Sequence, residues 1–297
     1  MAERIVEVAE TACRISVRGG LLRLDDEEGR ELDRVVLSEL ACLVLGHPRL
    51  VVSHAALGSI CAAGGSVVVT DEKRCPVAWV LPLGRHSTMG ERFRAQAAAS
   101  APLRKRLWQA IVKAKIGAQG RLLQELTRDD AGLPALAARV RSGDPENLEA
   151  RASQRYWPRL FGDARFRRRR DGEDQNRLLN YGYTVLRALV ARAICGAGLH
   201  PGLGVHHHGR YDAMPLADDL MEPLRPLVDR AVAKLVAARG PAVPMDRETR
   251  GALLAIFLER YESGGESRTL FDLMARSAAS LAQSFETGRP GLWLPEL

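Results

Sequence analysis

The pattern of hydrophobic positions changes once along the chain. From residue 4 to about residue 83, short runs rich in Val, Ile and Leu are separated by polar or glycine-containing turns. Runs of this length and composition predict β-strands. One segment among them, residues 54–65, has helical spacing instead, with Ser53 as a suitable N-cap and glycines at its end. The first 84 residues therefore predict a small β-sheet domain that carries one helix.

From residue 92 onward, apolar residues recur every three or four positions, which is the spacing of amphipathic helices. Glycines end these runs where helix C-termini favour them, for example at Gly196 and Gly240. We therefore expect an α+β protein with a small N-terminal β-sheet domain and a larger all-α C-terminal domain. The polar segment 85–91 is the expected linker, which places the domains at 1–84 and 92–297.

The composition of the chain favours a polyanionic partner. The chain has 297 residues, with 43 Lys and Arg against 36 Asp and Glu, and its formal net charge is +7. Arginine supplies nearly all of the positive charge, since only five residues are lysine. Guanidinium groups bind phosphate through two parallel hydrogen bonds, so this balance favours nucleic acid, although a GC-rich genome would also replace Lys by Arg.

Cysteine usage and hydropathy indicate the compartment. The five cysteines show no CxxC spacing, and most have apolar or small neighbours typical of a core. No apolar run approaches the roughly 20 residues that cross a bilayer, and the charged N-terminus does not resemble a signal peptide. We expect a soluble cytoplasmic protein with no membrane contact.

Three consecutive histidines, residues 206–208, lie in a glycine-flanked loop that leads into an acidic segment. Asp218, Asp219 and Glu222 follow with helical spacing, which places three carboxylates on roughly one face. A bound cation would relieve their repulsion, and hard oxygen ligands suit Mg²⁺ or Mn²⁺. Alternatively, the acids stabilise the start of a helix, and the histidine loop packs one imidazole into the structure. A zinc site would need further Cys or His ligands, which are not found nearby.

Two features flank these residues. Pro223 follows Glu222 directly, and Pro226 lies close behind it, so we expect a kink or a helix start at this point. Upstream, Glu149 lies near the start of another predicted helix and has no charge partner close in sequence. One carboxylate in a first turn is usually a surface residue, but it also makes a plausible third metal ligand.

Arginines surround the predicted helix of Glu149. Some follow it at helical spacing, and others form a charged loop before residue 171, so a phosphate backbone could lie along this surface. A solvated basic face and a flexible connection explain the pattern equally well. The candidate DNA contacts are Arg151, Arg155, Arg165, Arg167, Arg168, Arg169 and Arg170.

The sequence also resembles a known family. Residues 178–229, from LLNYGY through GVHHHG and DLMEP to LVD, strongly resemble the CRISPR-associated adaptation endonuclease and integrase family, Cas-one (Cas1), in the form found beside Cas-nine effectors. Residues 147–162 are similar to that family's first-ligand helix, and residues 43–83 to its N-terminal β domain. The resemblance covers nearly the whole chain.

This resemblance implies a set of metal ligands. By position in the family's motifs, Glu149, His207 and Glu222 would bind one Mg²⁺ or Mn²⁺ ion and carry the catalysis. Alignment on the preceding Gly204 favours His207 over its two neighbours. The possible additional or alternative ligands are Asp219, His206 and His208.

The resemblance also implies a reaction and partners. The family inserts new spacers: a 3′-hydroxyl of short foreign double-stranded DNA, the prespacer, attacks a phosphodiester at the edge of a CRISPR repeat in a metal-assisted transesterification. It implies a prokaryotic homodimer, formed through the N-terminal domain, and a four-to-two complex with a Cas-two (Cas2) dimer. The alternatives are a stand-alone metal-dependent nuclease acting on branched or single-stranded DNA and a non-catalytic DNA-binding scaffold, which a chelator would distinguish from both enzymes.

Overall fold

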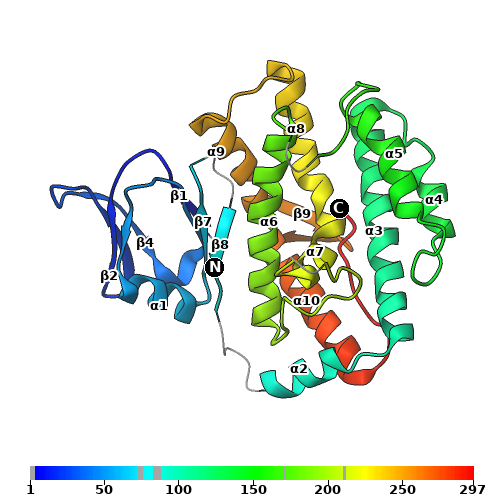
Figure 1. Cartoon of the computed structure of the whole chain (residues 1–297), viewed down its shortest axis with the longest axis horizontal. Helices are drawn as coiled ribbons and strands as arrows, with labels where there is room; N and C mark the ends of the chain where they lie inside the picture. Colours follow the sequence, from blue (N-terminus) through cyan, green and yellow to red (C-terminus); the bar gives the residue numbers. More distant parts are fainter. Residues whose placement is uncertain (1–3, 73–75, 83–87, 170–171, 210–211) are drawn as a thin grey trace.

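The N-terminal part of the chain is a β-structure with one α-helix, as predicted (Figure 1). The computed structural model describes residues 4–72, 76–82, 88–169, 172–209 and 212–297. The apolar runs of the first part form strands: burial alternates along β3, whereas β5 is buried along nearly its whole length, as in a central strand. The strands are β1 (Arg4–Val8), β2 (Arg14–Arg18), β3 (Leu21–Asp25), β4 (Glu31–Val36), β5 (Leu40–Leu45), β6 (Val51–Val52), β7 (Ser66–Thr70) and β8 (Pro76–Val80).

These strands form two four-stranded sheets, in the orders β1-β5-β7-β8 and β4-β3-β2-β6. In the first sheet β1, β5 and β7 are parallel and β8 is antiparallel to β7. Helix α1 (His54–Ala63) contacts β2 and β7, so it packs against both sheets. Ser53 caps α1 by accepting a hydrogen bond from the Ala56 N–H, and Gly64 ends it with a φ of +89°, which confirms both predicted ends.

The rest of the chain is mostly helical and packs beside the first sheet (Figure 1). Helix α6 lies at its centre, where it contacts the helices α7, α8, α9 and α10 and the strands β5, β7 and β8. The helices are α2 (Met89–Ala97), α3 (Ala101–Thr127), α4 (Leu133–Arg139), α5 (Leu148–Leu160), α6 (Asn176–Gly196), α7 (Pro215–Met221), α8 (Arg225–Arg239), α9 (Arg247–Ala255) and α10 (Leu270–Thr287), with 3₁₀ turns η1 (Leu37–Glu39), η2 (Glu222–Leu224) and η3 (Ile256–Leu258).

The two parts meet through a buried polar contact as well as through apolar packing. Glu7 of β1 accepts hydrogen bonds from the Tyr181 hydroxyl on α6 and from Arg250 Nε on α9. Arg250 is only 3% exposed. A guanidinium this deeply buried needs paired oxygen acceptors, so the contact fixes β1 against the helices.

Two details differ from the sequence-based expectation. The C-terminal part is not all-α, because β9 (Arg260–Ser263) and β10 (Glu266–Thr269) form an antiparallel hairpin between two of its helical segments. The hairpin turns at Gly264 and Gly265, whose φ values of +64° and +79° suit glycine. The long apolar run from residue 93 is also divided, because Ser100 begins α3 as a new N-cap.

The division into domains remains a prediction. Strand β8 ends at Val80 and helix α2 begins at Met89. Residues 83–87 of this connection, which include the start of the predicted linker, lie outside the described residues. The dimerisation role expected of the first domain also stays a prediction. Within the described ranges, no helix is both long enough and apolar enough to cross a membrane.

Candidate functional site

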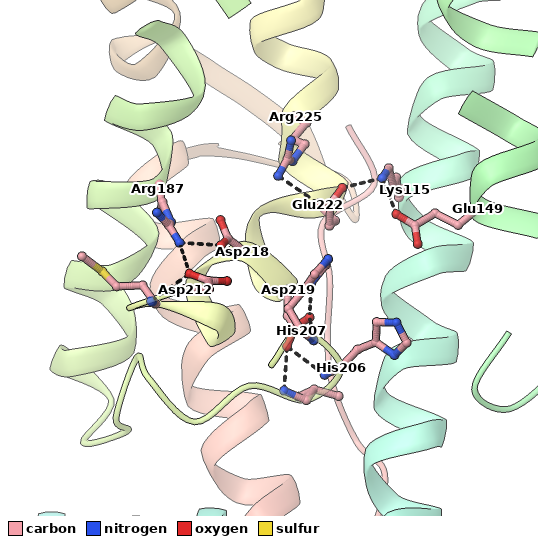
Figure 2. A network of polar contacts seen from close by, with 12 residues as sticks. Lys115, Glu149, Arg187, His206, His207, Asp212, Asp218, Asp219, Glu222 and Arg225 are labelled. Carbon is pink, nitrogen blue, oxygen red and sulfur yellow. Dashed lines mark hydrogen bonds and ion pairs between the residues drawn. The ribbon is translucent and has the colours of Figure 1, made fainter. Parts of the chain in front are cut away.

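A lysine joins two glutamates that are far apart in the sequence (Figure 2). Lys115 Nζ of α3 lies 2.6 Å from Glu149 Oε1 of α5 and 2.6 Å from Glu222 Oε2 of η2. The side chains of Lys115, Glu149 and Glu222 are 11%, 23% and 4% exposed. The structure therefore brings two predicted ligands, Glu149 and Glu222, to the same cation, and we call these two residues the acidic pair.

Local sequence explains how each glutamate reaches this position. Glu149 is the second residue of α5, whose start is capped by Asp144: its carboxylate accepts the N–H groups of Leu148 and Glu149. Glu222 lies where Pro223 interrupts the helix, so α7 ends at Met221 and α8 begins at Arg225, as the prolines predict. The break turns Glu222 inward, and its side chain is almost fully buried.

Opposite charges keep Glu222 ionised despite this burial. Arg225 NH2 lies 3.0 Å from Glu222 Oε1, and Lys115 contacts the other oxygen. Burial alone would raise the pKa of Glu222, but Arg225 and Lys115 outweigh burial and the pKa is lowered. Burial would likewise lower the pKa of Lys115, but Glu222 and Glu149 raise it. Glu222 is therefore a paired charge that is almost completely buried.

The histidine loop is held by Asp219, which is completely buried. Its carboxylate accepts the backbone N–H groups of Val205, His206 and His207. His207 Nδ1 lies 2.7 Å from Asp219 Oδ1, so this ring nitrogen donates to the carboxylate. The hydrogen bond to Asp219 raises the pKa of His207. Asp219 is thus the anchor of the loop in this structure.

The loop can fold this closely only with glycine at position 204. A Cβ atom there would lie 2.2 Å from the His207 carbonyl oxygen and 3.1 Å from Asp219 Oδ2. Any side chain at this position would push the loop away from its anchor.

The three histidines have different surroundings. His206 stacks on Trp108 of α3, with ring centroids 4.1 Å apart and planes 5° apart, and burial lowers its pKa. His207 has its second ring nitrogen available, since Nδ1 contacts Asp219. His208 is exposed. The hydrogen bond to Asp219 fixes the ring orientation of His207, and the charges of Glu222 and Glu149 help to raise its pKa.

The three carboxylates predicted on one helix face, those of Asp218, Asp219 and Glu222, each contact a different group. Asp218 pairs with Arg187, which also binds Asp212, while Asp219 anchors the loop and Glu222 contacts Lys115 (Figure 2). Burial raises the pKa of Asp218 to about 6. The expectation that these carboxylates share one ligand is therefore wrong for Asp218, because Arg187 already compensates its charge.

The donors fit a hard divalent ion, although they are not arranged as a complete cage. Among the described residues, no three His, Cys, Asp or Glu side chains are grouped as they would be around a metal. The Lys115 ammonium instead occupies the space between the acidic pair. Since both contacts are 2.6 Å, the two carboxylate oxygens lie no more than twice that distance apart, against about 4 Å across a Mg²⁺ ion. A small movement would therefore suffice for both to reach one ion.

Sequence reasoning missed three residues that build this site. Lys115, Arg225 and Trp108 contact the predicted ligands, but none was singled out. A signal existed for Lys115, because it shares helical spacing with the buried Ile111, Val112 and Gln119. A lysine on the apolar face of a helix is rare unless it is paired, so its position indicates a buried acid elsewhere in the chain.

The predicted DNA-contacting arginines lie mainly on the surface of α5 and after it. Arg151 is exposed, whereas Arg155 bonds to the Ala131 carbonyl group and Arg159 pairs with Asp129. Arg168 bonds to Asn176 and Asn180 and lies over the Tyr183 ring. Arg165, Arg167 and Arg169 are exposed, and Arg170 lies outside the described residues. DNA contact by any of them remains a prediction.

Comparison with known proteins places the chain in a family. Residues 6–254 match the family model described as CRISPR associated protein Cas1. The CRISPR-associated endonuclease Cas1 of Neisseria meningitidis serogroup C (strain 8013) is 36% identical over 211 residues, covering 70% of this chain and 69% of the relative. A casposase bound to integration product has a similar fold, with a TM-score of 0.80 at 17% identity over 97% of this chain and 92% of that one. A Cas6-RT-Cas1–Cas2 complex gives 0.77 at 18% identity over 99% and 36%. The chain belongs to the Cas1 family of CRISPR-associated proteins, and its fold is the fold of that family.

Proposed function

We propose that this protein is the integrase of CRISPR adaptation, a divalent-metal-dependent DNA endonuclease that joins the 3′-hydroxyl ends of short foreign DNA to the CRISPR repeat. The observation that carries the proposal is the acidic pair bridged by Lys115, and the ring of His207, which Asp219 orients, supports it. Glu149 and Glu222 already share one cation, the Lys115 ammonium group. The same two carboxylates are therefore suited to bind a divalent metal ion.

Glu149, Glu222 and His207 would hold the ion, and Mg²⁺ or Mn²⁺ suits these donors. Bound there, the metal would polarise a phosphoryl oxygen and stabilise the entering or leaving oxygen of the exchange. His207 would bind through its second ring nitrogen, because Asp219 holds the first. Asp219, His206 and His208 are not needed as ligands in this arrangement, since Asp219 already accepts three backbone N–H groups.

The cations at the site would act on the DNA. Lys115 and Arg225 lie against the acidic pair, so a phosphodiester that approaches the pair meets positive charge on the same side. They would neutralise the phosphate and hold it in line with the attacking hydroxyl, without a covalent protein intermediate. The net charge of +7 and the exposed arginines of α5 support binding of the two DNA segments, prespacer and repeat.

Partners follow from the family. A structural neighbour is a complex that contains Cas1 and Cas2, which supports a Cas2 partner for this chain. We propose that the protein acts as a homodimer, two of which flank a Cas2 dimer in a four-to-two complex in the prokaryotic cytoplasm.

The test is integration of a labelled oligonucleotide into a repeat-bearing plasmid by this protein, Cas2 and Mn²⁺. We expect Glu149→Ala and Glu222→Ala to abolish the labelled product and EDTA to do the same. Glu146→Ala is the matched control, because Glu146 is an exposed acid that pairs only with exposed arginines in the described structure. Full activity of either of the first two variants would refute the proposal.

The same assay addresses the other hypotheses. Strong cutting of branched or single-stranded DNA without Cas2, and no integration with it, would assign a stand-alone nuclease. Binding that is indifferent to EDTA, with no chemistry under any condition, would assign a scaffold.

A further inference from the structure

A cavity of about 690 Å³ adjoins the acidic pair on the far side of its cations. Lys115 and Arg225 line it, and they also contact Glu149 and Glu222. The cavity is enclosed by α3, α5, α6, α8 and the segment that follows α5. Its volume is typical of a site for a small ligand, so a group bound here would lie directly beside the proposed reaction centre.

Aromatic rings form part of the wall. Trp157 and Phe166 line the cavity, with their ring centroids 5.8 Å apart. Phe166 is buried, whereas Trp157 is only partly buried, and its ring also contacts the rings of Tyr156 and Phe161. Rings of this kind stack on nucleobases regardless of sequence, because every base has a flat π-face.

The polar lining has an unsatisfied acceptor. Gln119 of α3 is 3% exposed, and its Oε1 atom accepts no hydrogen bond from any described residue. A buried amide oxygen without a donor destabilises the protein, so the arrangement is one that a ligand with an N–H group would complete. Nucleobases carry such groups on their edges.

The charge of the cavity is positive. Arg167, Arg168 and Arg225 line it, with Lys115 at its inner end. Among the described residues that line the cavity, Asp229 is the one carboxylate, and it accepts hydrogen bonds from the hydroxyls of Tyr156 and Tyr183. Its single negative charge offsets only part of the positive charge of Lys115, Arg167, Arg168 and Arg225. The lining therefore favours an anionic ligand with a flat ring, which is the chemistry of a nucleotide.

We propose that this cavity receives one nucleotide of the reacting DNA strand, with its base against Trp157, its edge bonded to Gln119 and its phosphate beside Arg225. The inference rests on the proposed function, and adds to it a place where a nucleotide next to the reacting phosphate is unstacked and held. Stacking on Trp157 would offset part of the cost of removing the base from its neighbours. Because Gln119 offers a free acceptor, a base with an N–H group on its exposed edge fits better than a base in which that group is methylated.

The test measures binding without chemistry. 2-Aminopurine is placed at successive positions near the 3′ end of a short DNA, and its fluorescence is recorded with the full-length protein in EDTA. We expect one or two neighbouring positions to change strongly on binding, and Trp157→Ala to remove that change and weaken DNA binding about tenfold. A uniform response at all positions, or an unchanged response in Trp157→Ala, would overturn the proposal.

Gln119→Met tests the edge contact, with Gln124→Met as a matched control on the exposed side of the same helix. We expect the wild-type protein to bind DNA with thymine at the responsive position several-fold more tightly than DNA with N3-methylthymine, which lacks the edge N–H group. Gln119→Met should remove that preference, and Gln124→Met should keep it. Gln119→Met should also raise the unfolding temperature slightly, since it removes an unpaired buried oxygen, so lost binding would not be due to misfolding. A preference that Gln119→Met leaves intact would refute the contact.

Two further arms separate the possible outcomes. Deoxyadenosine monophosphate that competes at the responsive position as well as the DNA does would assign a site for free nucleotides and overturn the strand proposal. The integration assay stands apart from this one: activity that depends on Glu149 and Glu222 together with no position-specific fluorescence would refute only the cavity. Position-specific fluorescence in a protein without metal-dependent chemistry would support the cavity and refute the proposed function.

Discussion

Two buried acidic centres lie side by side in this protein, and they are compensated in different ways. Asp219 is paired with three backbone N–H groups and the ring of His207, which cannot leave without refolding the loop. Glu149 and Glu222 are paired with the end of a lysine side chain, which can rotate away. Fixed donors make a carboxylate part of the structure, whereas an exchangeable cation leaves it able to bind something else. The difference separates Asp219, the anchor, from Glu149 and Glu222, the proposed ligands.

The largest effect should come from removing the fixed centre. Asp219→Ala leaves three buried N–H groups without an acceptor, so we expect a loss of about 3 to 5 kcal/mol in the free energy of unfolding. Urea denaturation measures this loss, with Asp272→Ala, an acid in the first turn of α10, as the control. Mn²⁺ should not restore the stability of Asp219→Ala. A variant as stable as the wild type would show that the loop does not depend on this anchor.

An intermediate effect is expected at the exchangeable cation. Lys115→Met leaves two buried carboxylates facing each other, so the metal-free protein should lose about 2 to 3 kcal/mol. Mn²⁺ should recover most of this loss, because it replaces the missing charge, and should bind the variant more tightly than the wild type. Thermal unfolding with and without Mn²⁺ makes the comparison. Equal losses with and without the ion would contradict the idea that lysine and metal share one place.

The smallest effect concerns arginines of α5 that differ in pairing. Arg151 is exposed and forms no ion pair within the described residues, whereas Arg159 pairs with Asp129. If Arg151 contacts one phosphate, Arg151→Ala should reduce the slope of log affinity against log salt by about 0.9. Arg159→Ala should change it less, because Asp129 already offsets its charge. Equal slopes for Arg151→Ala and the wild type would assign Arg151 to solvent.

Much of the fold could be predicted because the local periodicity of hydrophobic residues indicates its helices and strands. The runs before residue 83 form the strands β1 to β8, and Ser53 and Gly64 define the helix among them. The hairpin β9–β10 was missed although its Gly264 and Gly265 mark a turn. The flanking strands are only four residues each, too short for alternation to compete with the helical spacing around them.

The candidate site was predictable in its acids and not in its cations. Glu149 and Glu222 were recognised from their motifs, and the structure brings them to one lysine. The identity of that lysine depends on how α3 packs against α5 and η2, which no local pattern specifies. The same holds for Trp108, whose contact with His206 joins residues almost a hundred positions apart. The proposed role of Glu149 and Glu222 as metal ligands is tested by the experiments above.

The interruption at Pro223 has a consequence for how this region can vary. Because η2 is a single short turn between α7 and α8, adding or deleting one residue there would rotate Glu222 by about 100° relative to α8. The carboxylate would then face away from α3, although both helices could still pack. We expect the spacing from Glu222 to Arg225 to tolerate no change in length, while substitutions on the exposed side of α8 are accepted freely.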